Sequence, residues 1–362
     1  MAGIDPRKTT ISMTYNRSDV SKKIANYVEN VTYEANATGS ADSLSISLDN
    51  SDARFNTSQM PKKGDRINAK LNFHNWLTAG KTFAVKCGIF MVDDVSFSGE
   101  PNVCDISGVS MPVKGNFKTQ RTKAYKKITL KELGKKIAKR AGIKLYYEGP
   151  VVNIKEIEQS DISDSEFLMN TCKEYGFGMK IYNGKIVIYD EETYEKKKPV
   201  ATINKKDCLD YNWNTTMQKT YTEAKVKYTD PSNDKNHCIT IGSKGRTLTT
   251  NVTAFSKKDA GLKAKAVLAD ENKKATTMSI TIEPNAKIVE TSVVNIQGFG
   301  KLNGKYFVEK IRYSISGGTK FSLELRKILA RASMGSIKNV KVSKKKKENN
   351  KRKKTVTKVK RK

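Results

Sequence analysis

The residues that could carry out catalysis are few in this sequence. It contains only two histidines among 362 residues. His74 stands close to Trp76 after an expected strand, where packing is the favoured role. His237 precedes Cys238, but neighbouring residues of a strand point to opposite faces, so the two are not expected to form a nucleophile with its base or a pair of metal ligands. Acidic residues are spread along the whole chain, and no two of them stand out as an acid and base pair. The sequence therefore predicts a protein that is not an enzyme and has no catalytic residue, cofactor or metal site.

A glycine-containing loop and the cysteines are the remaining candidates for ligand sites. Residues 242–246, Gly-Ser-Lys-Gly-Arg, have the composition of a phosphate-binding loop but not the spacing and final Lys-Ser/Thr of a P-loop. A basic hairpin turn is predicted there. The five cysteines are odd in number and include no C-x-x-C pair, which argues against a disulfide framework or a zinc site and favours a reducing compartment.

Positive charge is concentrated at the end of the chain. Residues 338–362 hold fourteen Lys or Arg and one acid, Glu348, and so carry 13 of the 31 net charges. No aromatic side chain is available there to stack on bases, so base recognition is not expected. Two uses remain open, which are docking on an acidic protein neighbour and unspecific attraction to nucleic acid. The residues predicted to bind a partner are Lys344, Lys345, Lys346, Lys347, Lys351, Arg352, Lys353 and Lys354.

The elements that must position these groups are mainly strands. Up to about residue 115, apolar residues such as Leu44, Ile46 and Leu48 alternate with serines, the period of a half-buried antiparallel sheet. Residues 196–332 again read as strands, with one helix at about 260–272. After Arg331 the periodicity stops, and the Lys-rich remainder is too polar to offset its ordering entropy.

Residues 116–195 have a different pattern. Thr129 and Glu132 form a capping box before an apolar helical stripe, and Ser163 with Glu166 forms a second. Asn183-Gly184 between two apolar runs predicts a type I′ hairpin. The predicted fold is α+β, mainly β: two similar β-barrel (tube-like) domains at 1–115 and 196–332, a small inserted α+β domain at 116–195, and a flexible basic tail at 333–362.

A weak internal repeat bears on symmetry. Residues 88–98 align with residues 304–314 without a gap. In both copies an apolar strand face is interrupted by an acid, Asp93 or Glu309. Chance similarity between two strands is the alternative; a true repeat would make the first and third segments duplicated barrels. The predicted barrel signature consists of Gly88, Phe90, Val92, Gly304, Tyr306 and Val308.

Four groups of motifs follow one another along the chain. They are Gly64-Asp65 with Gly88–Val95 and Ser98–Pro101; Thr129–Ile143; Gln159 with Ser163-Asp164, Phe167-Leu168 and Tyr175-Gly176; and Leu302–Val308. Their order resembles the late control protein D family, the hub proteins of contractile phage tails and phage-tail-like bacteriocins, which are related to the first part of type VI spike proteins. The resemblance covers about residues 30–330, and the arm beyond residue 338 departs from it.

This resemblance implies a structural baseplate hub that performs no catalysis. Hubs of this kind are homotrimers in which each chain contributes two similar barrels, so that a ring of six units meets a six-fold tube and the other end fits a three-fold spike. The implied partners are a trimeric spike protein and a tail tube or tube-initiator protein. The tape-measure protein and other baseplate proteins are further candidates. The expected location is the bacterial cytoplasm during assembly and then the tail of a phage or bacteriocin.

Two rival functions stay open from the sequence. One is a basic protein that binds nucleic acid through its Lys-rich tail; the other is a cell-wall hydrolase at the tail tip, although no acid pair can be nominated for it. A membrane partner is not expected, because the first residues are polar and no window reaches the 18 or so apolar residues that span a bilayer.

Overall fold

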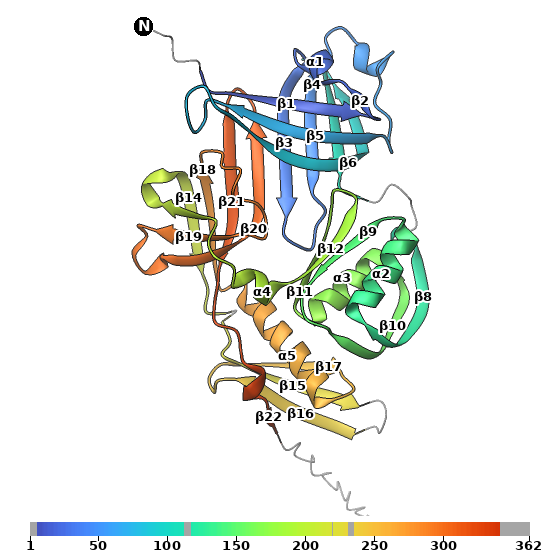
Figure 1. The fold of residues 1–362 in the computed structure, drawn as a ribbon, viewed down its shortest axis with the longest axis vertical. Helices are drawn as coiled ribbons and strands as arrows, with labels where there is room; N and C mark the ends of the chain where they lie inside the picture. The colour runs from blue at the N-terminus through green and yellow to red at the C-terminus, as the bar shows by residue number, and fades with distance from the viewer. Residues whose placement is uncertain (1–5, 112–116, 219, 231–234, 341–362) are drawn as a thin grey trace, which may run out of the picture.

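The computed structural model describes residues 6–111, 117–218, 220–230 and 235–340, and strands dominate it (Figure 1). The longer helices lie outside one large sheet of 13 strands. The predicted fold class, α+β and mainly β, is confirmed. In the described ranges no helix has the length and apolar character that crossing a bilayer needs.

The first β region contributes six main strands to the large sheet. They are β1 (Lys8–Tyr15), β3 (Val28–Asn36), β4 (Ser43–Asp49), β5 (Arg66–His74), β6 (Thr82–Ser98) and β7 (Val103–Val109). Their order in the sheet is β3-β4-β7-β6-β5-β1, and all neighbours are antiparallel. The short β2 (Ser18–Asp19) extends β1, next to the four-residue helix α1 (Ser21–Ile24). Leu44, Ile46 and Leu48 are buried, as their alternation with serines predicts.

The second β region contributes six strands in the same order. They are β13 (Ala201–Asn204), β14 (Cys208–Thr215), β18 (Thr276–Ile282), β19 (Val293–Gln297), β20 (Gly304–Ile315) and β21 (Thr319–Lys327). Their spatial order is β14-β18-β21-β20-β19-β13. If the strands of each region are numbered along the chain, both orders read 2-3-6-5-4-1. They differ at the last pair, because β13 runs parallel to β19 whereas β1 runs antiparallel to β5. The two β regions therefore share a strand order and, apart from this last pair, the strand directions.

The two regions are joined edge to edge. β20 pairs with β3 in an antiparallel ladder in which Tyr313 lies opposite Tyr33. The ladder makes one continuous sheet, with one apolar core beneath both regions. Burial of this shared apolar surface favours a fixed arrangement of the two halves.

The inserted unit lies between the two regions in the chain and packs beside the first one (Figure 1). It has its own core and consists of β8 (Gln120–Thr129), α2 (Leu130–Ala141), β9 (Lys144–Glu148), β10 (Asn153–Ser163), α3 (Asp164–Glu174), β11 (Phe177–Tyr182), β12 (Lys185–Asp190) and α4 (Glu191–Glu195). The Thr129 hydroxyl accepts from the Glu132 N–H, and the Glu132 carboxylate accepts from the Thr129 N–H, which confirms this capping box. Positive φ angles of 48° at Asn183 and 68° at Gly184 confirm the tight hairpin between β11 and β12.

A second small unit, here called the α5 unit, interrupts the second β region between β14 and β18. It consists of β15 (Glu223–Asp230), β16 (Lys235–Gly242), β17 (Thr247–Thr253) and α5 (Lys257–Asn272). The later strand β22 (Lys338–Asn339) joins its sheet. Its sheet order is β17-β15-β16-β22, and α5 packs on the sheet around a separate core. β17 runs parallel to β15, so residues 243–246 cross the end of β15 instead of joining two paired strands. The predicted hairpin turn at 242–246 is wrong, because the chain changes its pairing partner there.

Ordered structure continues past residue 332. Met334–Ser336 form a short 3-10 helix, and β22 pairs with β16 opposite Ile239 and Thr240. Each of the eight basic residues predicted to bind a partner, from Lys344 to Lys354, lies outside the described residues.

Candidate assembly interface

The six predicted signature residues occupy matching places in β6 and β20. Phe90, Val92, Tyr306 and Val308 are all buried in the sheet, and the glycine that begins each copy has a positive φ, 98° in β6 and 135° in β20. At Gly88 an added Cβ would lie 3.5 Å from the ring of Tyr182, which belongs to the inserted unit. The first copy of the repeat therefore also contacts the inserted unit.

The acid within each copy marks a β-bulge. Pairing between β6 and β7 shifts by one residue between Val92 and Asp94, which leaves Asp93 as the extra residue. Pairing between β20 and β21 shifts in the same way between Val308 and Lys310, around Glu309. A bulge bends its strand and increases the local twist. An acid therefore interrupts the apolar face because the bulge removes that position from the regular alternation.

The backbone partners at the two bulges also match. The Val92 N–H donates to the Asp65 carbonyl at 2.8 Å, and the Gly64 N–H donates to the Val92 carbonyl at 2.8 Å. In the second copy the Val308 N–H donates to Ser292 and the Thr291 N–H donates to Val308, both at 2.9 Å. Gly64 and Thr291 both have positive φ. Sequence comparison misses this match because Gly64-Asp65 and Thr291-Ser292 share no residue type.

A second matching bulge relates β3 to β14. The β3–β4 register shifts between Val28 and Asn30, and the β14–β18 register shifts between Cys208 and Asp210. The paired residues can be followed from β6 through β7 and β4 to β3, and in the same way from β20 through β21 and β18 to β14. Tyr33 of β3 then occupies the position that Trp213 has in β14. The two halves thus correspond in strand order and in two β-bulges.

The pairing of β20 with β3, here called the internal junction, combines aromatic packing with ion pairs. The rings of Tyr33 and Tyr313 are buried and stacked, with centroids 6.4 Å apart and an interplanar angle of 10°. On the other face of the ladder, Glu34 pairs with Lys310 at 3.0 Å and with Arg312. Partial burial acts to raise the pKa of the Glu34 carboxyl, but these two cations outweigh it and hold the pKa below its usual value.

A buried ion cluster fixes the inserted unit against both halves. Lys180 of β11 lies 3.0 Å from Asp42, next to β4, and 2.6 Å from Glu290, next to β19. The side chains of Lys180, Asp42 and Glu290 are 4%, 1% and 12% exposed, respectively. Burial raises the pKa of Asp42 to about 6, although the Lys180 cation opposes the rise. One cation thus holds an acid from each half.

Hydrogen bonds along β11 complete this contact. The Met179 N–H donates to the Thr38 hydroxyl and that hydroxyl donates to the Met179 carbonyl, both at 3.1 Å. The Ser110 hydroxyl donates to the Ile181 carbonyl at 2.9 Å. Side chains of the first β region therefore satisfy backbone groups at the edge of the inserted sheet.

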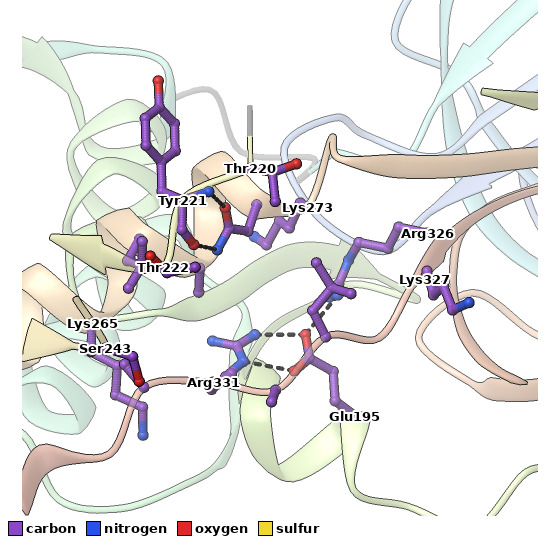
Figure 2. Close-up of a pocket in the computed structure, with 17 residues that line it drawn as sticks. Glu195, Thr220, Tyr221, Thr222, Ser243, Lys265, Lys273, Arg326, Lys327 and Arg331 are labelled. Atoms are coloured by element: carbon purple, nitrogen blue, oxygen red, sulfur yellow. Dashed lines mark hydrogen bonds and ion pairs between the residues drawn. The ribbon is translucent and has the colours of Figure 1, made fainter. Parts of the chain in front are cut away.

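The glutamates of α4 form a second ion cluster, at the junction of the inserted unit with α5 and β21. Glu195 accepts two bonds of 2.6 Å from Arg331, as Figure 2 shows, and pairs with Arg326 at 2.7 Å. Glu191 pairs with Lys273 at 2.8 Å. Burial acts to raise the pKa of Glu195, but Arg331 and Arg326 outweigh it and the pKa is lowered.

A cavity of about 360 Å³ adjoins this cluster, lined by α5, the end of β21 and the loop at residues 220–222 (Figure 2). Its wall includes four cations that each pair with an acid. These are Lys265, Lys273, Arg326 and Arg331. The charge of these four cations is therefore compensated within the protein.

The histidines and cysteines that the sequence offers as candidate catalytic or metal-binding groups make packing and hydrogen-bond contacts instead. His74 ends β5 between the hydroxyls of Thr10 and Thr82, at 3.4 and 3.0 Å. His237 stacks on Tyr228 while Cys238 is buried on the opposite face of β16, as predicted. All five cysteines are free. Across the part of the chain that the structure describes, no group of three or more His, Cys, Asp or Glu could hold a metal ion.

Comparison with known proteins gives similarities to phage tail components. A search against models of protein families finds no match. The chain is 25% identical over 217 residues to the "Probable baseplate hub protein" of Escherichia phage P2, a match that covers 58% of this chain and 54% of that protein. The chain thus spans about half the length of this curated relative.

Two solved structures share the fold over most of the chain. A tail protein from Neisseria meningitidis has a TM-score of 0.67 at 13% identity, with 88% of this chain and 96% of that chain covered. A type VI secretion component of Escherichia coli, described as structurally similar to T4 bacteriophage tail proteins, has a TM-score of 0.56 at 8% identity, with 90% and 80% covered. At these identities the likeness is one of fold.

Proposed function

We propose, from the relationship of this chain to baseplate hub proteins of phage tails, that it is the structural hub of a contractile tail. In this role three copies form a ring that joins the six-fold tail tube to a three-fold central spike. The observation that carries the proposal is the duplication: both β regions have the strand order 2-3-6-5-4-1 and matching bulges.

Duplication suits an adapter because it provides two symmetries in one chain. Three copies would present six similar β regions to the tube. The inserted unit and the α5 unit each occur once per chain, so three copies would present three of each. A ring with six similar units in one layer and three in another fits both a six-fold and a three-fold neighbour.

The ion clusters are consistent with a structural role. The Lys180 and Glu195 clusters link parts of the chain that are over 100 residues apart. Buried polar networks whose members come from distant parts of a chain hold the packed units in one arrangement. We assign the chain a structural and not a catalytic role, with a tube or tube-initiator protein and a trimeric spike as its partners. A tape-measure protein is a further candidate partner.

The test is the mass of the assembly. Mass photometry of the purified chain should give particles with three times the mass of the 40.5 kDa chain, and adding its spike should raise this mass by that of the spike trimer. A chain that stays monomeric in the presence of its spike would contradict the proposal.

A further inference from the structure

Parts of β6 and β14 are open edges of the large sheet. From Asp94 to Ser98, β6 pairs with β7 on one side, and no strand of the described residues covers its other side. β14 pairs with β18 on one side, and its other side is likewise uncovered by any described strand. Open edges present unpaired backbone donors and acceptors that can pair with another chain.

The internal junction shows what fits these edges. Within the chain, β20 is the counterpart of β6, and the matching edge of β20 is covered by β3. The counterpart of β3 is β14. The strand missing from the edge of β6 is therefore β14 of a second copy of the chain, because β14 of the same chain forms the far end of the sheet, beyond β20.

Side-chain exposure at equivalent positions supports this. Tyr313 of β20 is 0% exposed under β3, whereas its counterpart on β6, Phe97, is 39% exposed. Val31 of β3 is 1% exposed at the internal junction, whereas its counterpart on β14, Tyr211, is 44% exposed. Large apolar side chains are thus uncovered where their counterparts are covered, which is typical of an interaction surface.

The backbone N–H and C=O groups of β14 are also directed as pairing with β6 requires. The Ala37 N–H donates to the Glu309 carbonyl, so alternate residues of β3, including Tyr33, direct their backbone groups toward β20. By the same alternation Trp213 directs its groups away from β18, since the Thr216 N–H bonds to Ala275 on the β18 side. The open edge of β14 therefore carries free backbone groups at the positions that the internal junction uses.

We infer that β14 of one copy pairs antiparallel with β6 of the next, in the register of the internal junction. This external junction places Trp213 opposite Phe97 and Asn214 opposite Ser96. It rests on the proposed ring and names the surfaces that would close it. The internal junction has the ion pair of Glu34 and Arg312 where the external junction has Asn214 and Ser96.

Disulfide trapping tests the register. In the antiparallel ladder Asn214 and Ser96 form a non-hydrogen-bonded pair, the closest kind, with Cα atoms about 4.5 Å apart, within the range that a disulfide bridges. Asn214→Cys with Ser96→Cys, in a Cys208→Ser background, should give covalently linked dimers and trimers on a non-reducing gel. The matched control, Asn212→Cys with Ser96→Cys, is two residues out of register and should remain unlinked.

The outcomes of this experiment distinguish an error in the external junction from an error in the proposed function. Trimers with links in the matched pair alone support the external junction. Trimers by mass photometry that link in the control pair, or in neither pair, overturn the external junction and leave the proposed function standing. If the parent chain itself stays monomeric with its spike, and the variant is monomeric and melts at the same temperature as the parent, both the external junction and the proposed function are overturned.

Discussion

Lys180→Met should destabilise the protein strongly, because it removes the cation that pairs with the buried Asp42 and the partly buried Glu290. Lys180 lies 3.0 Å from Asp42 and 2.6 Å from Glu290, and the Asp42 side chain is 1% exposed. Methionine fills a similar volume without charge. The variant therefore leaves two carboxylates facing an apolar side chain in a buried site.

The size of the effect follows from the cost of an unpaired buried charge. Breaking a buried ion pair by removing one partner costs about 3–5 kcal/mol. In the variant Asp42 avoids that charge by keeping its proton, whereas in the native protein its pKa is about 6 and it is mostly ionised at pH 7. Keeping Asp42 protonated at pH 7, one unit above its pKa in the native protein, costs the variant about 1.4 kcal/mol of stability relative to the native protein. This contribution vanishes well below pH 6. The loss should therefore be smaller by about 1.4 kcal/mol at pH 5 than at pH 7.

Urea unfolding followed by far-UV circular dichroism at pH 7 and pH 5 measures both numbers. Lys185→Met, at an exposed position on the same hairpin, is the matched control and should change little. Adding Asp42→Asn and Glu290→Gln should recover most of the loss, since no charge is then left buried. A Lys180→Met variant within 1 kcal/mol of the native protein at pH 7 would refute the reasoning.

Four further predictions concern other parts of the molecule. Gly88→Ala should lower the free energy of unfolding by about 1–2 kcal/mol, because alanine is strained at a φ of 98°, and an unchanged urea midpoint would contradict this. Ser96→Glu with Asn214→Glu should shift trimers toward monomers at low salt, and Ser96→Arg with Asn214→Glu should restore them, in mass photometry. Deleting 341–362 should impair particle assembly and leave the trimer intact; normal particles in electron micrographs would argue against a docking role. Because Arg331 and Arg326 lower the pKa of Glu195, its stabilisation should be lost as pH falls below the ordinary value of 4.5, and Glu195→Gln should reduce that loss in thermal melts from pH 6 to pH 3.

The duplication was only partly visible in the sequence. Residues 88–98 and 304–314 share glycine, aromatic and valine positions because both strands need the same bulge and the same buried face. β3 and β14 share only an apolar alternation, with Tyr33 in place of Trp213, so no residue type reveals their equivalence. The pairing of β20 with β3 joins residues nearly 280 apart in the chain, which periodicity cannot predict.

The sequence predicts the helix α5, but not the separate unit that it forms with β15, β16 and β17, and not the ion clusters. Strands at 223–253 alternate like those of the large sheet, so their separate, partly parallel pairing leaves no local signal. The face that α5 buries is made largely of alanine and glycine, which gives only a weak apolar stripe. Lys180 within the apolar strand Phe177–Tyr182 was a visible anomaly, but its acidic partners are more than 100 residues away.

Cryo-electron microscopy of the purified oligomer bound to its spike tests the central claim most directly. We predict three copies in a closed ring, in which the internal pairing of β20 with β3 alternates with the pairing of β6 in one copy with β14 in the next, to give six similar junctions. A ring whose copies meet through other elements, or particles with no closed ring, would contradict the account.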